Sequence, residues 1–261
     1  MPGPTVWEFV ERECCNMNSL GVGSTLISLG KLEAVAASLS PSGCAGLAEA
    51  VERSAGETNP RGIANVLLAF SKLEAVEAAM LPSGWAVLSK AVERNARDMN
   101  AQDAATTLTG LRNLIAAAAA VAPSGWVGLA QAVERTTCEM NPRNVSGTLD
   151  ALSNLEAAAA VVPRDGWVGM AGAVERTTRG MNPYDFFGSL NSLNRLEAVT
   201  AEMSPSGCAG LAEAVERNAS GMGPRRVLTA LYALGPLKAV SAARGGGCGG
   251  QHEPSTYFQN A

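Results

Sequence analysis

A repeat of 41 residues runs through this 261-residue chain. The tripeptide Val-Glu-Arg occurs six times at that spacing, beginning at Val10, Val51, Val92, Val133, Val174 and Val215. A leucine recurs with the same period, and so does an asparagine in five of the units. An unbroken period of this length is typical of stacked repeats and not of a compact enzyme domain. We therefore expect function to lie on an extended surface.

Each unit is predicted to hold two helices. In one unit, Pro-Ser-Gly at 82–84 is expected to form a turn with Ser83 as the N-cap, followed by an apolar face that includes Trp85. The second helix is predicted to start at pairs such as Asn59-Pro60, since Asn caps helices and Pro suits the first helical position. It is predicted to continue through Leu-Glu-Ala to the next Pro-Ser-Gly. The predicted fold class is all-α: an α-solenoid of about six helical hairpins wound into a superhelix.

The array is expected to occupy residues 1–240, with units near 1–40, 41–81, 82–122, 123–163, 164–204 and 205–240. Residues 241–261 are Gly-rich and are expected to be disordered. Neither end has a polar capping unit, so we expect a fragment of a longer chain or association through the ends. The N-terminus resembles neither a secretory signal nor a transit peptide, and no apolar run is long enough to span a membrane.

The repeats lack the residue groups that catalysis or metal binding requires. The one histidine, His252, lies in the tail, and the sequence has no Cys-x-x-Cys pair and no phosphate-binding loop. We expect no enzyme activity, cofactor, metal or small-molecule substrate. Cys44 and Cys208 stand where sister units carry Trp, so these positions are predicted to be buried. The repeated Glu-Arg pair is predicted to join neighbouring units or to bind carbonyl groups at helix ends.

The positions that differ between units form a stripe along the second helices, at spacings of four, three and four residues. The stripe carries six cations and one anion, whereas the whole chain has a formal net charge of −4. Its Arg, Lys, Asn, Gln, Thr and Tyr side chains suit contacts with phosphates and bases. The candidates for RNA contact are Lys31, Arg61, Asn65, Lys72, Gln102, Thr106, Asn113, Arg143, Asn154, Tyr184, Asn191, Arg195, Arg225 and Tyr232. The simpler alternative is an ordinary solvated helix face.

The repeat unit resembles that of the octotricopeptide repeat proteins of algal organelles, which include chloroplast translation factors. The matching segments include Gly125 to Arg135, Met140-Asn141-Pro142 and Leu149 to Ala157. The resemblance implies an α-solenoid that binds single-stranded organellar RNA, about one base per repeat, and controls transcript stability, processing or translation. The resemblance also implies that the protein is located in an organelle, in the chloroplast rather than the mitochondrion. Without the resemblance, we would expect a cytoplasmic protein. Other repeat proteins are further expected partners.

Two functions remain open at this point. The first is binding of single-stranded RNA by the concave face of the second helices. The second is a protein–protein interaction scaffold of the same architecture, which the acidic composition favours, with 24 Asp and Glu against 20 Lys and Arg.

Overall fold

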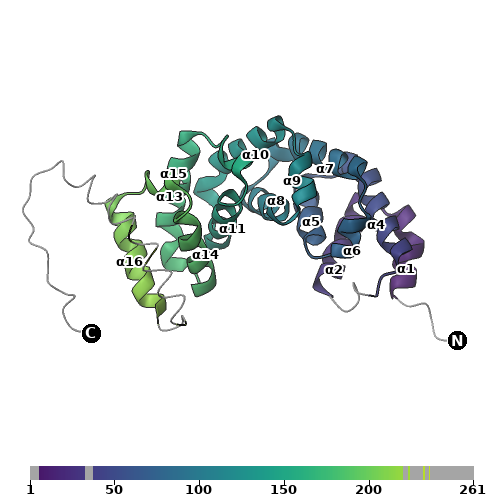
Figure 1. Cartoon of the computed structure of the whole chain (residues 1–261), viewed down its shortest axis with the longest axis horizontal. Helices are drawn as coiled ribbons and strands as arrows, with labels where there is room; N and C mark the ends of the chain where they lie inside the picture. The colour runs from purple at the N-terminus through teal and green to yellow at the C-terminus, as the bar shows by residue number, and fades with distance from the viewer. Residues whose placement is uncertain (1–5, 33–37, 220–222, 224–231, 233–234, 236–261) are drawn as a thin grey trace, which may run out of the picture.

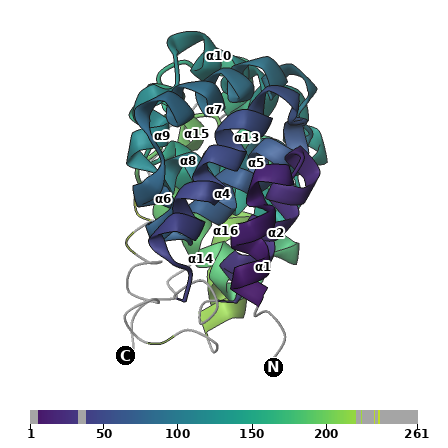
Figure 2. The same cartoon turned by 90° about the vertical axis from the view of Figure 1, so that its right-hand side faces the viewer.

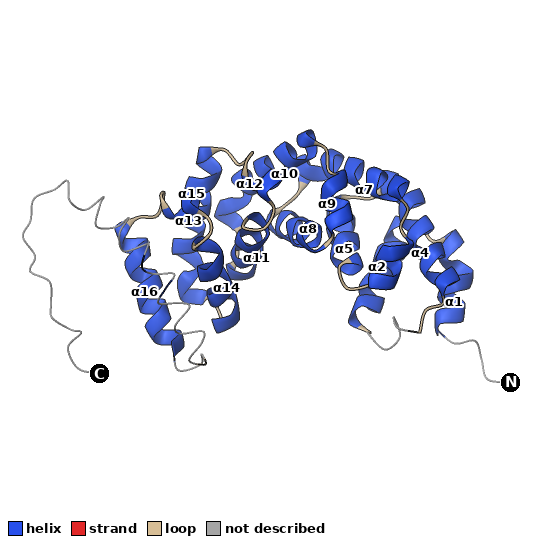
Figure 3. Ribbon diagram, in the orientation of Figure 1, coloured by secondary structure: helices blue, strands red, loops and turns tan. Residues whose placement is uncertain are grey.

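The chain forms an arch of helices, and this confirms the predicted all-α solenoid. The computed structural model describes residues 6–32, 38–219, 223, 232 and 235. Within these residues the regular elements are α-helices and short 3-10 helices, without a strand (Figure 3). The expected tail and most of the expected sixth second helix lie outside the described residues.

The first helix of each unit lies on the outer side of the arch (Figure 1). These outer helices are α1 (Val6–Glu13), α4 (Pro41–Ser54), α7 (Pro82–Asn95), α10 (Pro123–Thr136), α13 (Arg164–Thr177) and α16 (Pro205–Ala219). All but α16 are followed by a described 3-10 turn: η1 (Cys14–Asn16), η2 (Ala55–Glu57), η3 (Ala96–Asp98), η4 (Thr137–Glu139) and η5 (Thr178–Gly180). The turn redirects the chain into the second helix of the unit.

The second helix of each unit lies on the inner, concave side of the arch (Figure 1). These inner helices are α2 (Ser19–Lys31), α5 (Pro60–Phe70), α8 (Ala101–Asn113), α11 (Pro142–Leu152) and α14 (Pro183–Leu193). Each begins after an Asn whose side chain accepts a hydrogen bond from a backbone N–H in the first turn, as Asn59 does from Gly62 at 2.8 Å. The predicted Asn-Pro helix start is confirmed.

The Pro-Ser-Gly segment is the first turn of the outer helix, and the expected turn before that helix is wrong. Pro82 is the first helical residue, and the N-cap is Leu81 instead of Ser83. In α4 the capping hydroxyl comes from Ser40, which precedes the motif and accepts from the N–H of Gly43 at 3.0 Å. The fixed φ of proline suits this position because the first helical residue has no N–H to donate within the helix.

The unit also holds a third, short helix, which the sequence did not predict. These short helices are α6 (Glu74–Ala79), α9 (Ile115–Ala120), α12 (Glu156–Ala159) and α15 (Glu197–Thr200). The second helix therefore does not run through Leu-Glu-Ala. It stops because the leucine leaves helical conformation, as Leu114 does with φ −113° and ψ 87°, while its side chain is buried in the core. Neither Gly nor Pro marks this break in the sequence.

Each short helix packs on the outer helix of its own unit. Val76 of α6 and Ala117 of α9 are buried in the core. Figure 2 looks along the array from its N-terminal end and shows α6 and α9 on the same side of it. The short helices thus cover one side of the arch and leave the inner helices facing its concave side.

The arginine of four of the six Val-Glu-Arg tripeptides binds the unit before it. Arg94 donates to the carbonyl of Ala55 at 2.9 Å, and Arg135 donates to that of Met99 at 2.9 Å. Arg53 and Arg176 make the equivalent contacts. Carbonyl groups at a helix end lack helical donors, and the negative end of the helix dipole attracts a cation. The predicted structural role of this arginine is confirmed.

In the fifth unit the glutamate of the same tripeptide, Glu175, contacts the start of the next outer helix. Glu175 accepts hydrogen bonds from the backbone N–H of Ser204 at 2.7 Å and from its hydroxyl at 3.0 Å. These donors lie at the start of α16, where a negative charge is favourable. Glu175 and Arg176 therefore reach in opposite directions along the array, and α13 is tied to both of its neighbours.

One core runs the length of the described array. Trp85, Trp126 and Trp167 are buried, as are Cys44 and Cys208 at the same repeat position, so these predictions are confirmed. Inner helices approach closely at Gly110 of α8, where an added Cβ would lie 2.9 Å from the carbonyl carbon of Leu67 in α5. A larger side chain at this position would separate two adjacent inner helices.

We expect Arg135→Ala to destabilise the array by about 1–2 kcal/mol, because it removes charged hydrogen bonds between units. The measurement is the urea midpoint, followed by circular dichroism. Arg97→Ala is the control, since Arg97 is exposed and has no hydrogen bond or ion pair among the described residues. Equal losses of stability in the two variants would contradict the contact assigned to Arg135.

Replacing Gly110 by Ala is expected to cost about 1–3 kcal/mol, the range for overpacked sites, because the new methyl group meets the α5 backbone. Gly172→Ala in α13 is the matched substitution, since an added Cβ there meets no atom within 4 Å. That variant should gain about 0.5–1 kcal/mol because Ala loses less backbone entropy in a helix. Thermal unfolding of both variants measures the two changes in stability. A gain in stability for Gly110→Ala would refute close packing of α5 on α8.

Candidate nucleic-acid interface

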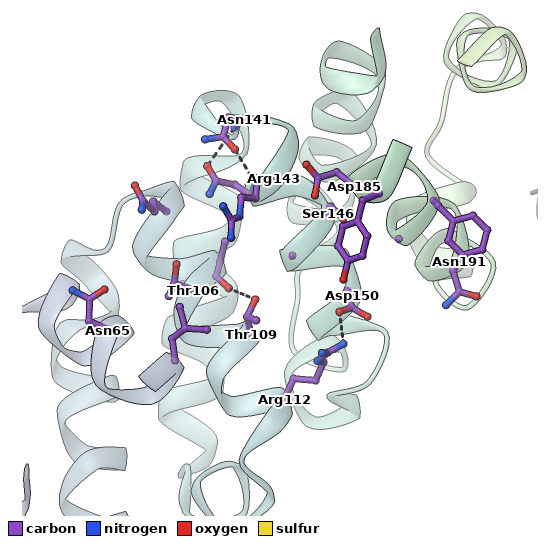
Figure 4. Close-up of a pocket in the computed structure, with 18 of the residues that line it drawn as sticks. Asn65, Thr106, Thr109, Arg112, Asn141, Arg143, Ser146, Asp150, Asp185 and Asn191 are labelled. Carbon is purple, nitrogen blue, oxygen red and sulfur yellow. Dashed lines mark hydrogen bonds and ion pairs between the residues drawn. The ribbon is translucent and has the colours of Figure 1, made fainter. Parts of the chain in front are cut away.

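A groove of about 950 Å³ crosses the inner helices (Figure 4). Its lining comes from α5, α8, α11 and α14, with Lys31 at the end of α2. Successive inner helices pack side by side, so one helix position recurs across the groove in each unit. The groove is therefore a row of equivalent sites that carry different side chains.

Half of the candidate stripe lines this groove. The lining includes the candidates Lys31, Asn65, Gln102, Thr106, Arg143, Tyr184 and Asn191. The candidates that do not line it are Arg61, Lys72, Asn113, Asn154, Arg195 and Tyr232. Arg225 lies outside the described residues. The structure thus brings together candidates from five consecutive units.

Several lining residues were not among the sequence candidates. They are Leu68, Ala105, Thr109, Arg112, Asn141, Asn144, Ser146, Gly147, Asp150, Asp185, Phe187 and Gly188. Leu68, Thr109 and Asp150 stand at the repeat position of the candidate Asn191, and Gly147 and Gly188 at that of Asn65, so the variable stripe includes them and they could have been named from it. The others lie beside the stripe, because a groove between helices exposes more than one position per turn.

The charge of the groove is smaller than that of the stripe. The lining cations are Lys31, Arg112 and Arg143, and the lining anions are Asp150 and Asp185. Arg112 forms an ion pair with Asp150 across the gap from α8 to α11. Three cations against two anions leave the lining with a formal excess of one positive charge.

A hydrogen-bond network joins the C-terminal ends of α11 and α14. Arg195 donates to the side-chain oxygen of Asn154 at 2.8 Å, and the Asn154 amide donates to the backbone carbonyl of Asp150 at 2.7 Å. Two of the sequence candidates, Asn154 and Arg195, therefore contact each other between units. Part of the hydrogen-bonding capacity of both side chains is therefore used within the protein.

Arg61, another candidate, lies near a buried carboxyl group. Burial raises the pKa of Asp103 above its ordinary value, and the Arg61 charge and a hydrogen bond from the backbone of Asn100 oppose that shift. Asp103 stands in the first turn of α8, with its side chain buried. The positive charge of Arg61 therefore acts partly on the carboxyl group of Asp103.

Comparison with known proteins gives no family for this chain. No model of a known protein family matches it, and no curated protein matches it. Among the described helices, none is long and apolar enough to cross a membrane.

We expect Asp103→Asn to stabilise the protein at pH 7. A raised pKa means that ionisation costs more in the folded chain than in the unfolded chain, so the carboxyl group lowers stability as pH rises above 3.8. The amide removes that cost and keeps the local contact, since Asn144 at the same repeat position accepts from the N–H of Asn141. Urea unfolding between pH 3 and pH 7 should show the gain shrinking as the pH falls.

The control for this substitution is Asp165→Asn, which removes a charge from the first turn of α13 at an exposed position. It should give no gain at pH 7, because no burial penalty is relieved. A loss of stability in Asp103→Asn at pH 7 would show that the helix dipole and Arg61 outweigh burial.

Proposed function

We propose that this protein binds single-stranded RNA along the groove formed by its inner helices. The observation that carries the proposal is the arrangement of the lining. Equivalent positions on consecutive helices present different polar side chains in one continuous groove, such as Thr106 in one unit and Asn65 in the unit before it. Repeat proteins that read one base per unit use this arrangement, with a few side chains per helix deciding the base.

Cations in and around the groove supply contacts for the phosphate backbone. Lys31 and Arg143 line it, and both are exposed. Lys72 occupies the repeat position of Lys31 in the next unit and is also exposed. Phosphate contacts of this kind provide most of the affinity of a single strand and make binding dependent on salt. The acidic remainder of the chain opposes non-specific binding elsewhere on its surface.

Aromatic and amide side chains supply contacts for bases. Tyr184 lines the groove, and 76% of its surface is exposed, so its ring is available for stacking. A base stacked on an aromatic ring contributes about 1–3 kcal/mol whatever its identity. Gln102 and Asn191 offer both a donor and an acceptor, which suits the edges of bases.

The biological role in this proposal follows from the resemblance to octotricopeptide repeat proteins. A strand-specific binder without chemistry of its own acts by covering an RNA segment. Covering a segment protects a transcript end, blocks a cleavage site or changes the folding around a start codon. We propose post-transcriptional control in an organelle as that role.

The test is a double charge reversal, Lys31→Glu with Arg143→Glu. Binding of a random single-stranded RNA 12-mer, followed by fluorescence anisotropy, should weaken by at least about tenfold at low salt. The slope of log affinity against log salt should fall by about 1.4, since each lost contact to a single strand contributes about 0.7.

The matched control is Lys90→Glu with Arg97→Glu, which makes the same change of charge on α7 and η3. Both side chains are exposed and neither lines the groove. RNA binding that survives in the groove variant, or that falls equally in both, would count against the proposed site.

An extended polypeptide is the second candidate ligand, and the apolar lining residues Leu68 and Phe187 favour it. Such a scaffold would bind a partner in the presence of nuclease and would show little dependence on salt. Binding to a partner that single-stranded RNA does not displace, with no RNA binding by the purified chain, would select this second function.

A further inference from the structure

Arg112 and Asp150 form an ion pair inside the groove (Figure 4). Arg112 extends from α8, and Asp150 belongs to α11 in the next unit. Their side chains are 29% and 36% exposed, so both are partly shielded from water and remain accessible from the groove. The other ion pairs of the described residues join side chains that do not line the groove.

The guanidinium of Arg112 is held in one orientation. Its Nε and Nη2 donate to the side-chain oxygen of Asn113 at 3.2 Å and 3.0 Å, and its Nη1 donates to a carboxylate oxygen of Asp150. A guanidinium has five N–H groups in a fixed plane. Three contacts leave two N–H groups, one on each terminal nitrogen, for a ligand in the groove.

This charged pair belongs to a single step of the array. The residues that align with Arg112 in the neighbouring units are Ser71 and Ser153. Those that align with Asp150 are Thr109 and Asn191. The steps on either side therefore carry neutral side chains, and the pair distinguishes one unit from its sisters.

We infer that Arg112, oriented by Asp150 and Asn113, selects a guanine base at this step of a bound RNA strand. The inference rests on the proposed function, which it makes more specific. Guanine presents two adjacent acceptors, O6 and N7, that match two parallel N–H donors of an arginine. Adenine presents a donor and an acceptor on the same edge, so it cannot satisfy both donors.

The ion pair also explains why Arg112 does not serve as a phosphate contact. A phosphate that approached Arg112 would come within reach of the Asp150 carboxylate, and like charges repel. A neutral base edge avoids that repulsion. Lys31 and Arg143 form no ion pair among the described residues, and they take the backbone contacts in the same groove.

The experiment measures the affinity of the full chain for three RNA 12-mers. One is all uridine, one carries a single central guanosine and one carries a single central adenosine. The wild-type protein should bind the guanosine probe about tenfold more tightly than the other two, as a bidentate base contact provides. Replacing the guanosine by 7-deazaguanosine, which lacks the N7 acceptor, should remove most of that preference.

Arg112→Lys keeps the positive charge but loses the paired donors. It should reduce the guanosine preference below about twofold and leave the affinity for the all-uridine probe within about twofold, because a base contact and not a backbone contact is lost. Arg112→Ser introduces the residue of the sister units and should lose the same preference. Asp150→Asn should bind the all-uridine probe more tightly, since Arg112 is then free to contact phosphate.

The outcomes separate this inference from the proposed function. Binding of RNA without a guanosine preference overturns the inference and leaves the function in place. So does an equal loss on all three probes in Arg112→Lys, because that pattern marks a phosphate contact. A wild-type chain that binds none of the probes overturns the proposed function, and the inference falls with it.

Discussion

The contact between the Val-Glu-Arg arginine and the preceding unit, which four of the six units make, determines how this array is built. The arginine binds carbonyl groups of the 3-10 turn that follows the previous outer helix, at 2.9 Å from Arg94 to Ala55 and 2.7 Å from Arg176 to Thr137. The turn is where the chain passes from the outer to the inner helix. The contact therefore sets the position of both helices of one unit against the next, and the same geometry repeats along the arch.

This stacking produces the groove as a consequence. Outer helices carry the repeated Val-Glu-Arg and join the units, while the short helices cover one side of the array. Inner helices are left on the concave side, close enough for Gly110 to lie against the backbone of α5. Variable side chains on those helices then occupy equivalent places in neighbouring units. A concave surface with one set of variable side chains per unit therefore follows from a contact between units that the outer helices make.

The period in the sequence was sufficient to predict the architecture, because a contact repeated in every unit must use the same residues. The capping role of Asn59 and the burial of Trp85 could be predicted for the same reason. The short helices could not, since the break at Leu114 depends on burying a side chain and not on Gly or Pro. The pairing of Arg112 with Asp150 also escaped prediction. It joins residues 38 apart on different helices, and its geometry depends on how the units stack.

The measurement that tests the central claim most directly is photochemical crosslinking of the protein to a single-stranded RNA that contains 4-thiouridine, with identification of the modified peptides. The proposed groove predicts adducts on inner-helix peptides, above all the α14 segment with Tyr184 and Phe187, which line it. Adducts that concentrate on the outer helices α7, α10 and α13, with the inner helices unmodified, would contradict the account.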